Sequence, residues 1–384
     1  MEKILHISPG PFCDGWTYQD NILTKYHKKM GFSVTMLTSN WIFNDKGEYE
    51  KVSEESYFNE DGVKVIRMRI NGNKHQNYPL KKFYNFYEYI VSEKPDIIFL
   101  HNLNYLDAKK VSNYCKKHKN VRLFVDNHCD ESNSGRNFIS KYFFHKFLWK
   151  TNAKALYKYA SMFFGVLPAR VEFLQKYYGV KKEKTDLLIM GADDEFVNKY
   201  KNTYDKRNQY FDGKINSDTT IIITGGKIDK FKIQTLSLMK YVLESKKKIC
   251  LLVFGSVDKE IQNDFFALVD NNKVIYLGWL NFEQTYEYIS LADICVFPGR
   301  HSVLWEQAVA QQKPLIVKRW SGTMHVNFSN NVIFLENDTF NELCSKLNDA
   351  LLPDKLIELK NNARKEGFKD FLYSNIAVRS LLME

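Results

Sequence analysis

The chain has 384 residues and carries 55 Lys and Arg against 45 Asp and Glu, which gives a formal net charge of +10 and a pI near 9.0. A hydrophobic share of 44% and a charged share of 26% are globular values, so a disordered, collagen-like or coiled-coil chain is excluded. The length predicts two domains. The aromatic share of 15% beside the positive charge leaves nucleic acid, an acidic membrane surface and phosphorylated small molecules open as partners.

The six cysteines are scattered, with no C-x-x-C and no zinc-ligand spacing, which favours reduced thiols in a cytosolic protein. The first residues, MEKILHISPG, enter an apolar strand without the basic and hydrophobic regions of a signal peptide. No apolar run approaches the ~20 residues that a membrane span needs. We therefore expect a cytoplasmic protein, at most peripheral at the inner face of the plasma membrane.

Short apolar runs rich in β-branched residues alternate with helix-period segments, as in βαβ units with parallel sheets. In the first half, a strand at 3–8 leads into a Gly- and Pro-containing loop, a helix at 18–30 that Gly31 ends, and a strand at 33–38. Further strands are predicted at 63–69, 96–100, 122–125 and 162–166, and helices at 84–91 and 108–117.

A polar segment at 198–218 interrupts the apolar pattern and marks a domain boundary. A second series follows, with strands at 219–224, 248–254, 273–277, 294–297, 314–318 and 331–335 and a helical stretch at 361–383. The sequence therefore predicts an α/β chain of two Rossmann-like doubly wound domains facing a central crevice. The expected parts are an N-terminal domain at 1–198, a C-terminal domain at 199–365, and a C-terminal helix at 366–384 that is a candidate to pack back on the first domain.

The second domain opens with a strand that runs into Gly225 and Gly226, followed by Lys227 and Lys232. Glycines after a parallel strand let the backbone approach a ligand, and the two lysines can face an anionic group there. An ordinary turn with solvated lysines is the alternative. The segment lacks the spacing of a Walker A loop, and no G-x-G-x-x-G follows the first strand, which argues against P-loop ATPases and dinucleotide oxidoreductases.

A second informative segment follows the strand at 294–297, where a Pro-Gly turn leads into a helix at 303–311. Glu306, near the start of this helix, can accept hydrogen bonds from a ribose diol, and the N–H groups beginning at Val303 can bind a diphosphate. The alternative is a glutamate that only complements the helix dipole. The turn itself presents Arg300, His301 and Ser302.

These motifs stand in the order found in the donor half of retaining family-four glycosyltransferases, which the chain resembles. The matching segments are GGK at 225–227 with Lys232, VFGS at 253–256, YLGWL at 276–280, FPG at 297–299 and WEQAVAQQKPLIV at 305–317. The first half is similar to the acceptor domain of that family in its loop at 10–15, DNHCD at 126–130, and LLIMGAD at 187–193. The resemblance covers nearly the whole chain and implies the glycosyltransferase-B fold.

The resemblance also implies roles for residues on the donor side. Gly226, Lys227 and Lys232 match the segment that holds the donor diphosphate, and Glu306 matches the second carboxylate of the paired-glutamate motif, which binds ribose. Trp279 and Leu280 lie where the nucleotide base rests, and Ser302 and Val303 belong to the donor-binding loop.

On the acceptor side, His128 matches the histidine near the transferred sugar, with a hydrogen-bonded core histidine as the alternative. Gly15, Trp16 and Thr17 lie on the loop that would close over the phosphates and the acceptor.

One departure concerns the first glutamate of the motif, whose position is occupied by Pro298. Arg300 and His301 stand where a carboxylate would touch the donor sugar, so we expect them, with His128, to be the catalytic candidates. An inactive relative is the alternative.

The resemblance implies a retaining, metal-independent hexosyltransferase that needs no cofactor beyond its nucleotide diphosphate sugar. The acceptor is expected to be a saccharide or lipid-linked saccharide in capsule, exopolysaccharide or O-antigen biosynthesis. A nucleotide-sugar 2-epimerase of the same fold and a non-catalytic basic module for membrane or nucleic acid are the alternatives, and nucleic acid is the least supported partner.

The segment from Ile139 to Tyr159 concentrates basic and aromatic residues. As a helix it could bring Phe143, Phe147 and Trp149 to a bilayer while its lysines at 141, 146, 150 and 154 meet anionic headgroups. A core-facing aromatic stripe with solvated lysines is the alternative. A membrane contact here would suit a lipid-linked acceptor.

Overall fold

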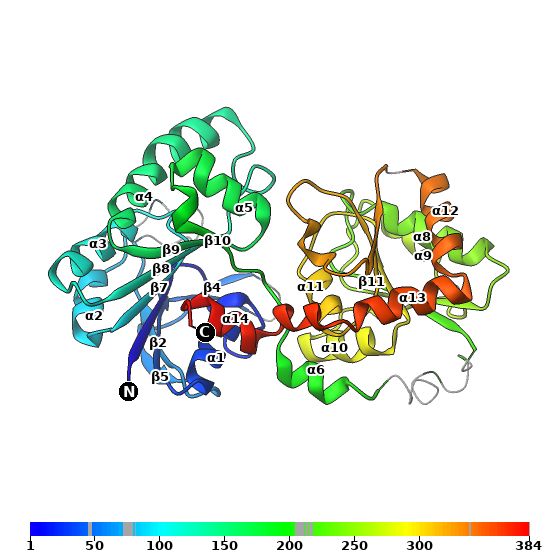
Figure 1. Ribbon diagram of the computed structural model, residues 1–384, viewed down its shortest axis with the longest axis horizontal. Helices are drawn as coiled ribbons and strands as arrows, with labels where there is room; N and C mark the ends of the chain where they lie inside the picture. Colours follow the sequence, from blue (N-terminus) through cyan, green and yellow to red (C-terminus); the bar gives the residue numbers. More distant parts are fainter. Residues whose placement is uncertain are drawn as a thin grey trace. The chain divides into compact units, whose positions relative to one another are not determined.

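The computed structural model describes the chain except residues 45–47, 72–79, 81, 204–210, 212–214, 216–217, 338 and 384. Two compact units make up the described chain (Figure 1): unit 1 is Met1–Ile189 with Ile376–Glu384, and unit 2 is Met190–Asn375. The chain thus changes units before helix α6 (Asp194–Tyr200), and the boundary expected at 198/199 falls inside that helix. Most of the polar segment expected at 198–218 lies outside the described residues.

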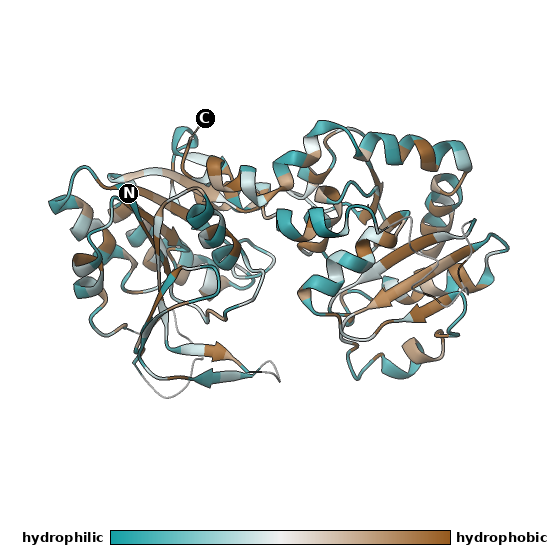
Figure 2. Cartoon of the chain, turned by 90° about the horizontal axis from the view of Figure 1, so that it is seen from below, coloured by the Kyte–Doolittle hydropathy of each residue, from teal (hydrophilic) through white to brown (hydrophobic). Residues whose placement is uncertain are grey.

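Unit 1 contains an eight-stranded sheet in the order β10-β9-β8-β7-β1-β2-β6-β5, parallel except for β5. Its strands are β1 (Lys3–Ser8), β2 (Ser33–Ser39), β5 (Ser56–Phe58), β6 (Lys64–Met68), β7 (Ile97–His101), β8 (Arg122–Asn127), β9 (Ala160–Gly165) and β10 (Thr185–Leu187). A separate antiparallel pair joins β3 (Trp41–Phe43) and β4 (Tyr49–Lys51). The central strands read as continuous apolar runs because both faces of a parallel sheet are covered by helices, as the brown strands in Figure 2 illustrate.

The helices of unit 1 cover the two faces of this sheet differently. The helical segments are α1 (Gln19–Lys29), α2 (Phe86–Glu93), α3 (Ala108–Lys117), a π-helix at Ile139–Trp149, α4 (Lys150–Tyr157), α5 (Pro168–Phe173), a π-helical turn at Leu174–Tyr178, a 3₁₀ turn at Lys182–Lys184, and α14 (Tyr373–Ser380). Leu5 and Ile98 share one core with residues of α2, α3 and α4. On the opposite face, His6 stacks on Phe99 and contacts α1 through His27.

Unit 2 contains a six-stranded parallel sheet in the order β13-β12-β11-β14-β15-β16. Its strands are β11 (Thr220–Gly225), β12 (Ile249–Phe254), β13 (Val274–Tyr276), β14 (Ile294–Phe297), β15 (Leu315–Lys318) and β16 (Val332–Leu335). The order reverses between β11 and β14, which is the switch point where doubly wound sheets bind ligands beyond the carboxyl ends of their strands.

The helical segments of unit 2 flank this sheet. They are α6, α8 (Gln234–Glu244), α9 (Gln262–Phe266), α10 (Phe282–Leu291), α11 (Leu304–Ala310), a 3₁₀ turn at Met324–Val326, α12 (Phe340–Ala350), α13 (Pro353–Ala363) and a 3₁₀ segment at Glu366–Phe371. Leu251 and Ile294 belong to a core that includes residues of α8, α12 and α13.

The single helix expected at the C-terminus is wrong, because the chain leaves α-helical geometry between Ala363 and Tyr373 and forms a 3₁₀ segment at Glu366–Phe371. The Phe371 carbonyl accepts from the Ala192 N–H at 2.8 Å and the Tyr373 N–H donates to the Ala192 carbonyl at 3.1 Å, which holds Leu372 extended. Gly367 also packs tightly, since a Cβ there would lie 2.3 Å from the ring of Phe328. Tertiary contacts therefore override the helical period. Of the expected helix, residues from Ile376 onward belong to unit 1.

Replacing Gly255 with alanine should destabilise unit 2 by about 2 kcal/mol or more. Gly255 follows β12 at φ +112°, and a Cβ there would lie 2.0 Å from the carbonyl oxygen of Gly226. The measurement is the urea midpoint of unfolding, with Gly10→Ala as the control because a Cβ at Gly10 meets nothing within 4 Å. Equal midpoints for the two variants would contradict the close approach of these loops.

Candidate functional site

In unit 2 the side chain of Lys232 lies against two glycines at the switch point between β11 and β14. Gly226 has φ +103°, and a Cβ on it would lie 2.9 Å from Nζ of Lys232. A Cβ on Gly299 would lie 2.9 Å from Cγ of the same lysine. The two glycines thus make room for the lysine, which reaches the carboxyl ends of both strands.

The charge of Lys232 is not neutralised by a neighbour. Within the described part of the chain, its ammonium group has neither a hydrogen-bond partner nor an ion-pair partner. Burial lowers the pKa of Lys232 below its usual value, Asp229 raises it, and the charge of Arg300 lowers it again. The guanidinium of Arg300 lies 4.4 Å from the centre of the Phe231 ring, and Lys227 is exposed. This end of the sheet is therefore suited to an anion.

Helix α11 positions Glu306 in the interior of unit 2, where two histidines hold it. Glu306 is fully buried, and its Oε1 accepts from Nε2 of His301 and from Nε2 of His325, both at 2.8 Å. Burial alone would raise the pKa of Glu306, but the charges and hydrogen bonds of His301 and His325 lower it well below its usual value. Glu306 is thus a carboxylate at neutral pH.

Several polar atoms around Glu306 are buried without a hydrogen bond among the described residues, including Oε2 of Glu306 itself, Nδ1 of His325 and Oγ of Ser302. A buried acceptor without a donor costs about 1–3 kcal/mol. A ligand hydroxyl that donated to Oε2 would remove that cost. The oxygen of Glu306 without a hydrogen bond among the described residues is therefore Oε2, which is buried, whereas His301, which was expected at the donor sugar, contacts Oε1.

The base-binding candidates lie on the loop between β13 and α10. Gly278 turns the chain with φ +74°, after which Trp279 is 74% exposed and Leu280 is buried. An exposed indole face is suited to stacking on a base, whereas Leu280 belongs to the packing beneath the loop.

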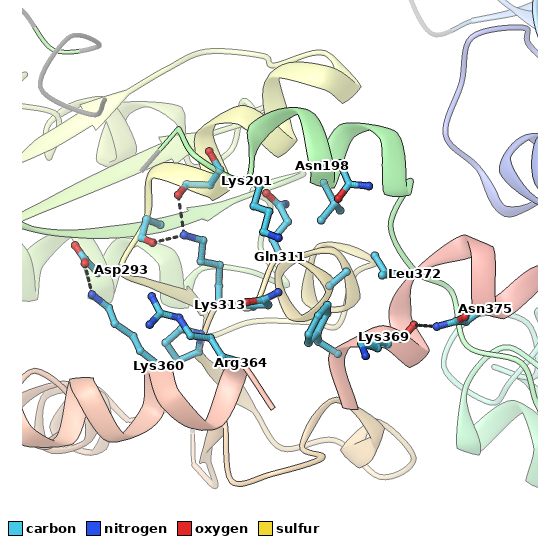
Figure 3. A pocket seen from close by; sticks show the side chains of 17 residues that line it. Asn198, Lys201, Asp293, Gln311, Lys313, Lys360, Arg364, Lys369, Leu372 and Asn375 are labelled. Carbon is cyan, nitrogen blue, oxygen red and sulfur yellow. Dashed lines mark hydrogen bonds and ion pairs between the residues drawn. The ribbon is translucent and has the colours of Figure 1, made fainter. Parts of the chain in front are cut away.

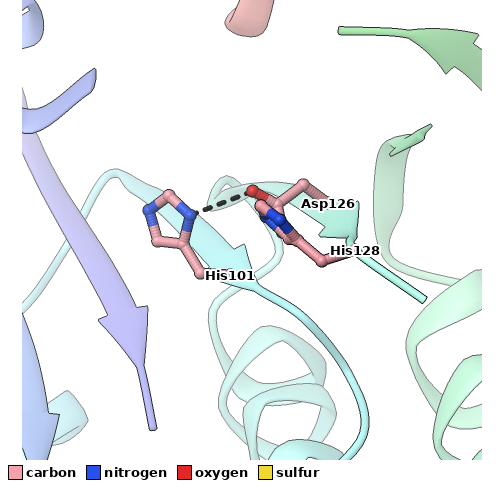
Figure 4. A group of neighbouring side chains, drawn as sticks. All are labelled: His101, Asp126 and His128. Carbon is pink, nitrogen blue, oxygen red and sulfur yellow. Dashed lines mark hydrogen bonds and ion pairs between the residues drawn. The ribbon is translucent and has the colours of Figure 1, made fainter. Parts of the chain in front are cut away.

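In unit 1, Asp126 at the end of β8 joins His101 and His128 (Figure 4). Asp126 is fully buried; its Oδ2 lies 2.9 Å from Nδ1 of His101 and its Oδ1 lies 3.3 Å from Nε2 of His128. The side chain of His128 is 34% exposed, so the expected sugar-side histidine is anchored at one nitrogen and open to solvent. Burial alone would raise the pKa of Asp126, but His128 and His101 hold it far below its usual value.

The expected closing loop follows β1 in the same unit. Gly15 has φ +72°, and the indole of Trp16 stacks on Phe43 with a ring separation of 5.4 Å. Thr17 is half-buried beside it. The loop is thus held to β3 through the stacking of Trp16 on Phe43.

Neither group of histidines and carboxylate requires a metal ion to explain its geometry. The ligand atoms of His301, Glu306 and His325 lie within 4.8 Å of one another, as do those of a second group, His101, Asp126 and His128. In each group the carboxylate faces both imidazoles, and these contacts account for the approach of the three side chains.

Sequence reasoning missed His325, Asp126 and His101 as site residues. His325 stands 19 residues after its partner Glu306, in a 3₁₀ turn without a motif of its own. Asp126 belonged to the quoted DNHCD segment, and a charged residue at the end of a buried strand was the available signal.

Searches of family models and of curated proteins find no match to this chain. Solved structures do match it over nearly its full length. Sucrose-phosphate synthase from Thermosynechococcus elongatus is 16% identical, with a TM-score of 0.67 over 99% of this chain and 97% of that one. WaaG, a glycosyltransferase involved in lipopolysaccharide biosynthesis, is 17% identical with a TM-score of 0.65 over 99% of each chain. HepE from Anabaena, solved with UDP and glucose, is 14% identical with a TM-score of 0.62 over 99% and 98%.

The chain has the glycosyltransferase-B fold. The expected fold class, with two Rossmann-like domains, is thereby confirmed. At these identities the likeness shows the architecture and leaves the activity to be argued from the residues.

A cavity of about 470 Å³ lies at the amino ends of strands β14 and β15 in unit 2 (Figure 3). Asp293 and Lys313, just before β14 and β15, line it together with Lys360. Lys313 donates to the carbonyls of Ser290 and Ala292, and burial lowers the pKa of Lys313 to about 8. Since these residues precede their strands, the cavity lies at the amino ends of the strands. Lys232, Gly226 and Gly299 lie at the carboxyl ends, so the two places are separate.

The basic and aromatic segment forms a π-helix at Ile139–Trp149 followed by α4. Phe143 and Phe147 are 56% and 65% exposed, as the bilayer hypothesis requires, whereas Trp149 is buried in the core of unit 1, so its expected surface position is wrong. Trp149 packs against Phe144 on the inward side of the helix. Among the described residues, no helix has the length and hydrophobicity needed to cross a bilayer.

Glu306→Gln should lower the free energy of unfolding of unit 2 by about 1–3 kcal/mol at pH 7, because the amide removes a charge that His301 and His325 stabilise. The pKa of Glu306 is depressed in the folded chain, so its contribution is present above the ordinary value of 4.5 and is lost as the pH falls below it. Urea unfolding at pH 7, 5 and 4 measures this difference. The exposed Glu260→Gln serves as control, and a Glu306→Gln deficit that does not shrink toward pH 4 would contradict the assignment.

Proposed function

We propose that this chain is a glycosyltransferase that transfers a sugar from a nucleotide diphosphate sugar to a saccharide or lipid-linked saccharide acceptor. The observation that carries the proposal is the ammonium of Lys232, which has no partner among the residues that the structure describes and lies between Gly226 and Gly299 at the switch point of the sheet. Sheets of this kind bind phosphates at that point. Structures of the same fold that hold UDP and glucose support the choice of ligand class.

Breaking a glycosyl phosphate bond places negative charge on the leaving diphosphate and positive charge on the sugar. Lys232, Lys227 and Arg300 are the cations that would stabilise the leaving group, which requires no metal ion in this scheme. Pro298 in place of the first motif glutamate leaves the donor sugar without that carboxylate. We infer retention with attack from the side of the departing phosphate, whose oxygen would take the acceptor proton.

With the diphosphate at Lys232, the base and the ribose of the donor would meet other residues of unit 2. Trp279 offers its exposed face to the base. Oε2 of Glu306, buried and without a donor among the described residues, would accept from a ribose hydroxyl once the donor opens a path to it. His301 donates to Oε1 and so fixes the orientation of the Glu306 carboxylate. We therefore assign His301 a positioning role and no direct contact with the reacting atoms. His128 remains the sugar-side candidate of unit 1, with Gly15, Trp16 and Thr17 on the loop expected to close over the acceptor.

We propose a role in the assembly of capsule, exopolysaccharide or O-antigen, at the inner face of the plasma membrane. The support is the exposed pair Phe143 and Phe147 beside the exposed Lys146, which together fit an interface of acyl chains and anionic headgroups. A lipid-linked acceptor would then be presented to unit 1 at that surface.

A panel of nucleotide sugars should contain at least one that raises the melting temperature of the chain, and Lys232→Ala should weaken its binding about 10- to 100-fold. The reason is the loss of a charge-assisted contact to the diphosphate. Isothermal calorimetry measures the affinity. Lys230→Ala is the control, since the Lys230 ammonium lies over the exposed Phe231 ring and not against Gly226.

Unchanged affinity in Lys232→Ala would remove the diphosphate assignment. Incorporation of solvent deuterium at C2 of the donor sugar without any acceptor would instead identify a 2-epimerase.

The double variant Phe143→Ser/Phe147→Ser should lose at least tenfold in binding to vesicles that contain acidic phospholipid, because each exposed ring contributes apolar area at the interface. Vesicle cosedimentation at two salt concentrations is the measurement. Phe58→Ser, which changes a phenylalanine of unit 1 that is 70% exposed on β5, is the matched control. Equal binding of both variants would contradict a membrane role for the π-helix.

A further inference from the structure

A continuous line of buried side chains runs through unit 1 from Asp126 to helix α14. Nδ1 of His101 lies 2.9 Å from Oδ2 of Asp126, and Nε2 of His101 lies 2.9 Å from Nδ1 of His6. Nε2 of His6 lies 2.9 Å from Nδ1 of His27, whose Nε2 lies 2.9 Å from Oγ of Ser380. All five side chains are between 0 and 4% exposed.

This line joins side chains from five elements, namely β8, β7, β1, α1 and α14. Asp126 ends β8, His101 ends β7, His6 lies within β1, and His27 lies near the end of α1. Because β1, β7 and β8 are neighbours in the sheet, the two strand histidines and the carboxylate fall on adjacent strands. Each ring has both nitrogens in contact, as burial of a polar group requires.

The number of protons in the line follows from its contacts. Three imidazoles take part in four contacts: carboxylate to His101, His101 to His6, His6 to His27, and His27 to α14. Each contact needs one hydrogen. Three neutral rings supply three, so the fourth must come either from the Ser380 hydroxyl or from one additional proton on the rings.

The carbonyl of Ala377 decides between these two cases. The Ser380 hydroxyl donates to this carbonyl at 2.8 Å, so its one hydrogen is already in use. Nε2 of His27 also faces the Ala377 oxygen, at 3.3 Å, and two acceptors cannot share a contact without a hydrogen. Nε2 of His27 therefore carries a hydrogen, and the three rings together hold one proton more than three neutral imidazoles.

His101 is the ring that holds the additional proton, because it alone touches a carboxylate. Burial alone would lower the pKa of His101, yet the charge and hydrogen bond of Asp126 raise it above its usual value. Burial lowers the pKa of His6 well below its usual value, and neighbouring His27 and His101 lower it further. Burial lowers the pKa of His27 to about 3.

We propose that Asp126, His101, His6 and His27 form a buried proton relay in which the His101 imidazolium links the carboxylate beside His128 to the seating of helix α14. If His101 lost its additional proton, Nε2 of His101 would become an acceptor. The hydrogens of His6 and His27 would then move from Nε2 to Nδ1. The Ser380 hydroxyl would then turn toward His27, and the Ala377 carbonyl would lose both of its side-chain donors. At the other end, the charge of Asp126 would face His128 without a balancing cation.

The relay makes His101 a positioning residue for His128, which it does not touch. It also gives the C-terminal residues of the chain a direct connection to the strand ends of unit 1. The relay does not depend on the proposed glycosyltransferase activity, since its signature is the protonation of four side chains in the full chain.

The charged and titratable groups around His101 set the pH at which the link operates. Asp126 and His128 face it from β8 and the following loop, His6 from β1, and Asp20 acts from α1. A pKa raised on folding means that the stabilisation is complete below the ordinary value of 6.5 and is lost as the pH rises through the folded value. Helix α14 should therefore loosen toward alkaline pH.

The first test is nitrogen NMR of the full chain labelled with ¹⁵N-histidine at pH 7. His101 should show both nitrogens protonated, while His6 and His27 should carry hydrogen only at Nε2. A neutral His101, protonated only at Nδ1, would overturn the proposal. This measurement uses the unaltered protein, so its outcome does not depend on whether any variant folds.

The second test is hydrogen exchange of the amides of α14 between pH 6.5 and 9.5, corrected for intrinsic rates. Exchange should accelerate with pH in the unaltered chain, whereas in His101→Gln it should be about tenfold faster at pH 6.5 and lose that pH dependence. His118→Gln is the matched control, because His118 is exposed on Tyr114 and outside the relay. Exchange in α14 that is the same in His101→Gln and in His118→Gln would overturn the link.

Discussion

Each unit of this chain contains a fully buried carboxylate that is clasped by two imidazoles. In unit 1 it is Asp126, between His101 and His128, and in unit 2 it is Glu306, between His301 and His325. A charge in the interior of a parallel sheet protein costs several kcal/mol unless it is paired and hydrogen-bonded. Each buried carboxylate therefore requires two histidines beside it. His101 comes from the end of β7, His128 and His301 from loops that follow strands, and His325 from a 3₁₀ turn.

The sheets could be predicted from the sequence because parallel strands covered on both faces must be apolar throughout. The strands at 3–8 and 294–297 have the expected bounds, and others differ by one or two residues. The C-terminal helix could not be predicted, because the extended geometry of Leu372 depends on its pairing with Ala192, 180 residues away. The same holds for Trp149, whose burial depends on the direction that the π-helix faces and not on its aromatic spacing.

The residues of the candidate site could be predicted from the sequence where they lie within short motifs. The glycines at 226 and 299 and the lysine at 232 fall in motifs whose meaning follows from backbone approach and charge, and the structure does bring them together. The buried histidines lie in no such motif, and their partners are distant in sequence. His6 occupies one position in an apolar strand, and the contacts of its two ring nitrogens, to residues 21 and 95 positions away, explain why a polar side chain is there.

The loop after β14 shows how one substitution changes the electrostatics of such a site. Where the resemblance expects a glutamate, Pro298 is followed by Gly299, and the stem of Lys232 fills the space above that glycine. No carboxylate stands there to offset the lowered pKa of Lys232, which burial lowers most and the charge of Arg300 lowers further. A bound diphosphate would place negative charge beside Lys232 and so raise its pKa again. Binding of an anion and uptake of a proton are thus coupled at this edge, so affinity for the anion falls as the pH rises through the pKa of the free lysine.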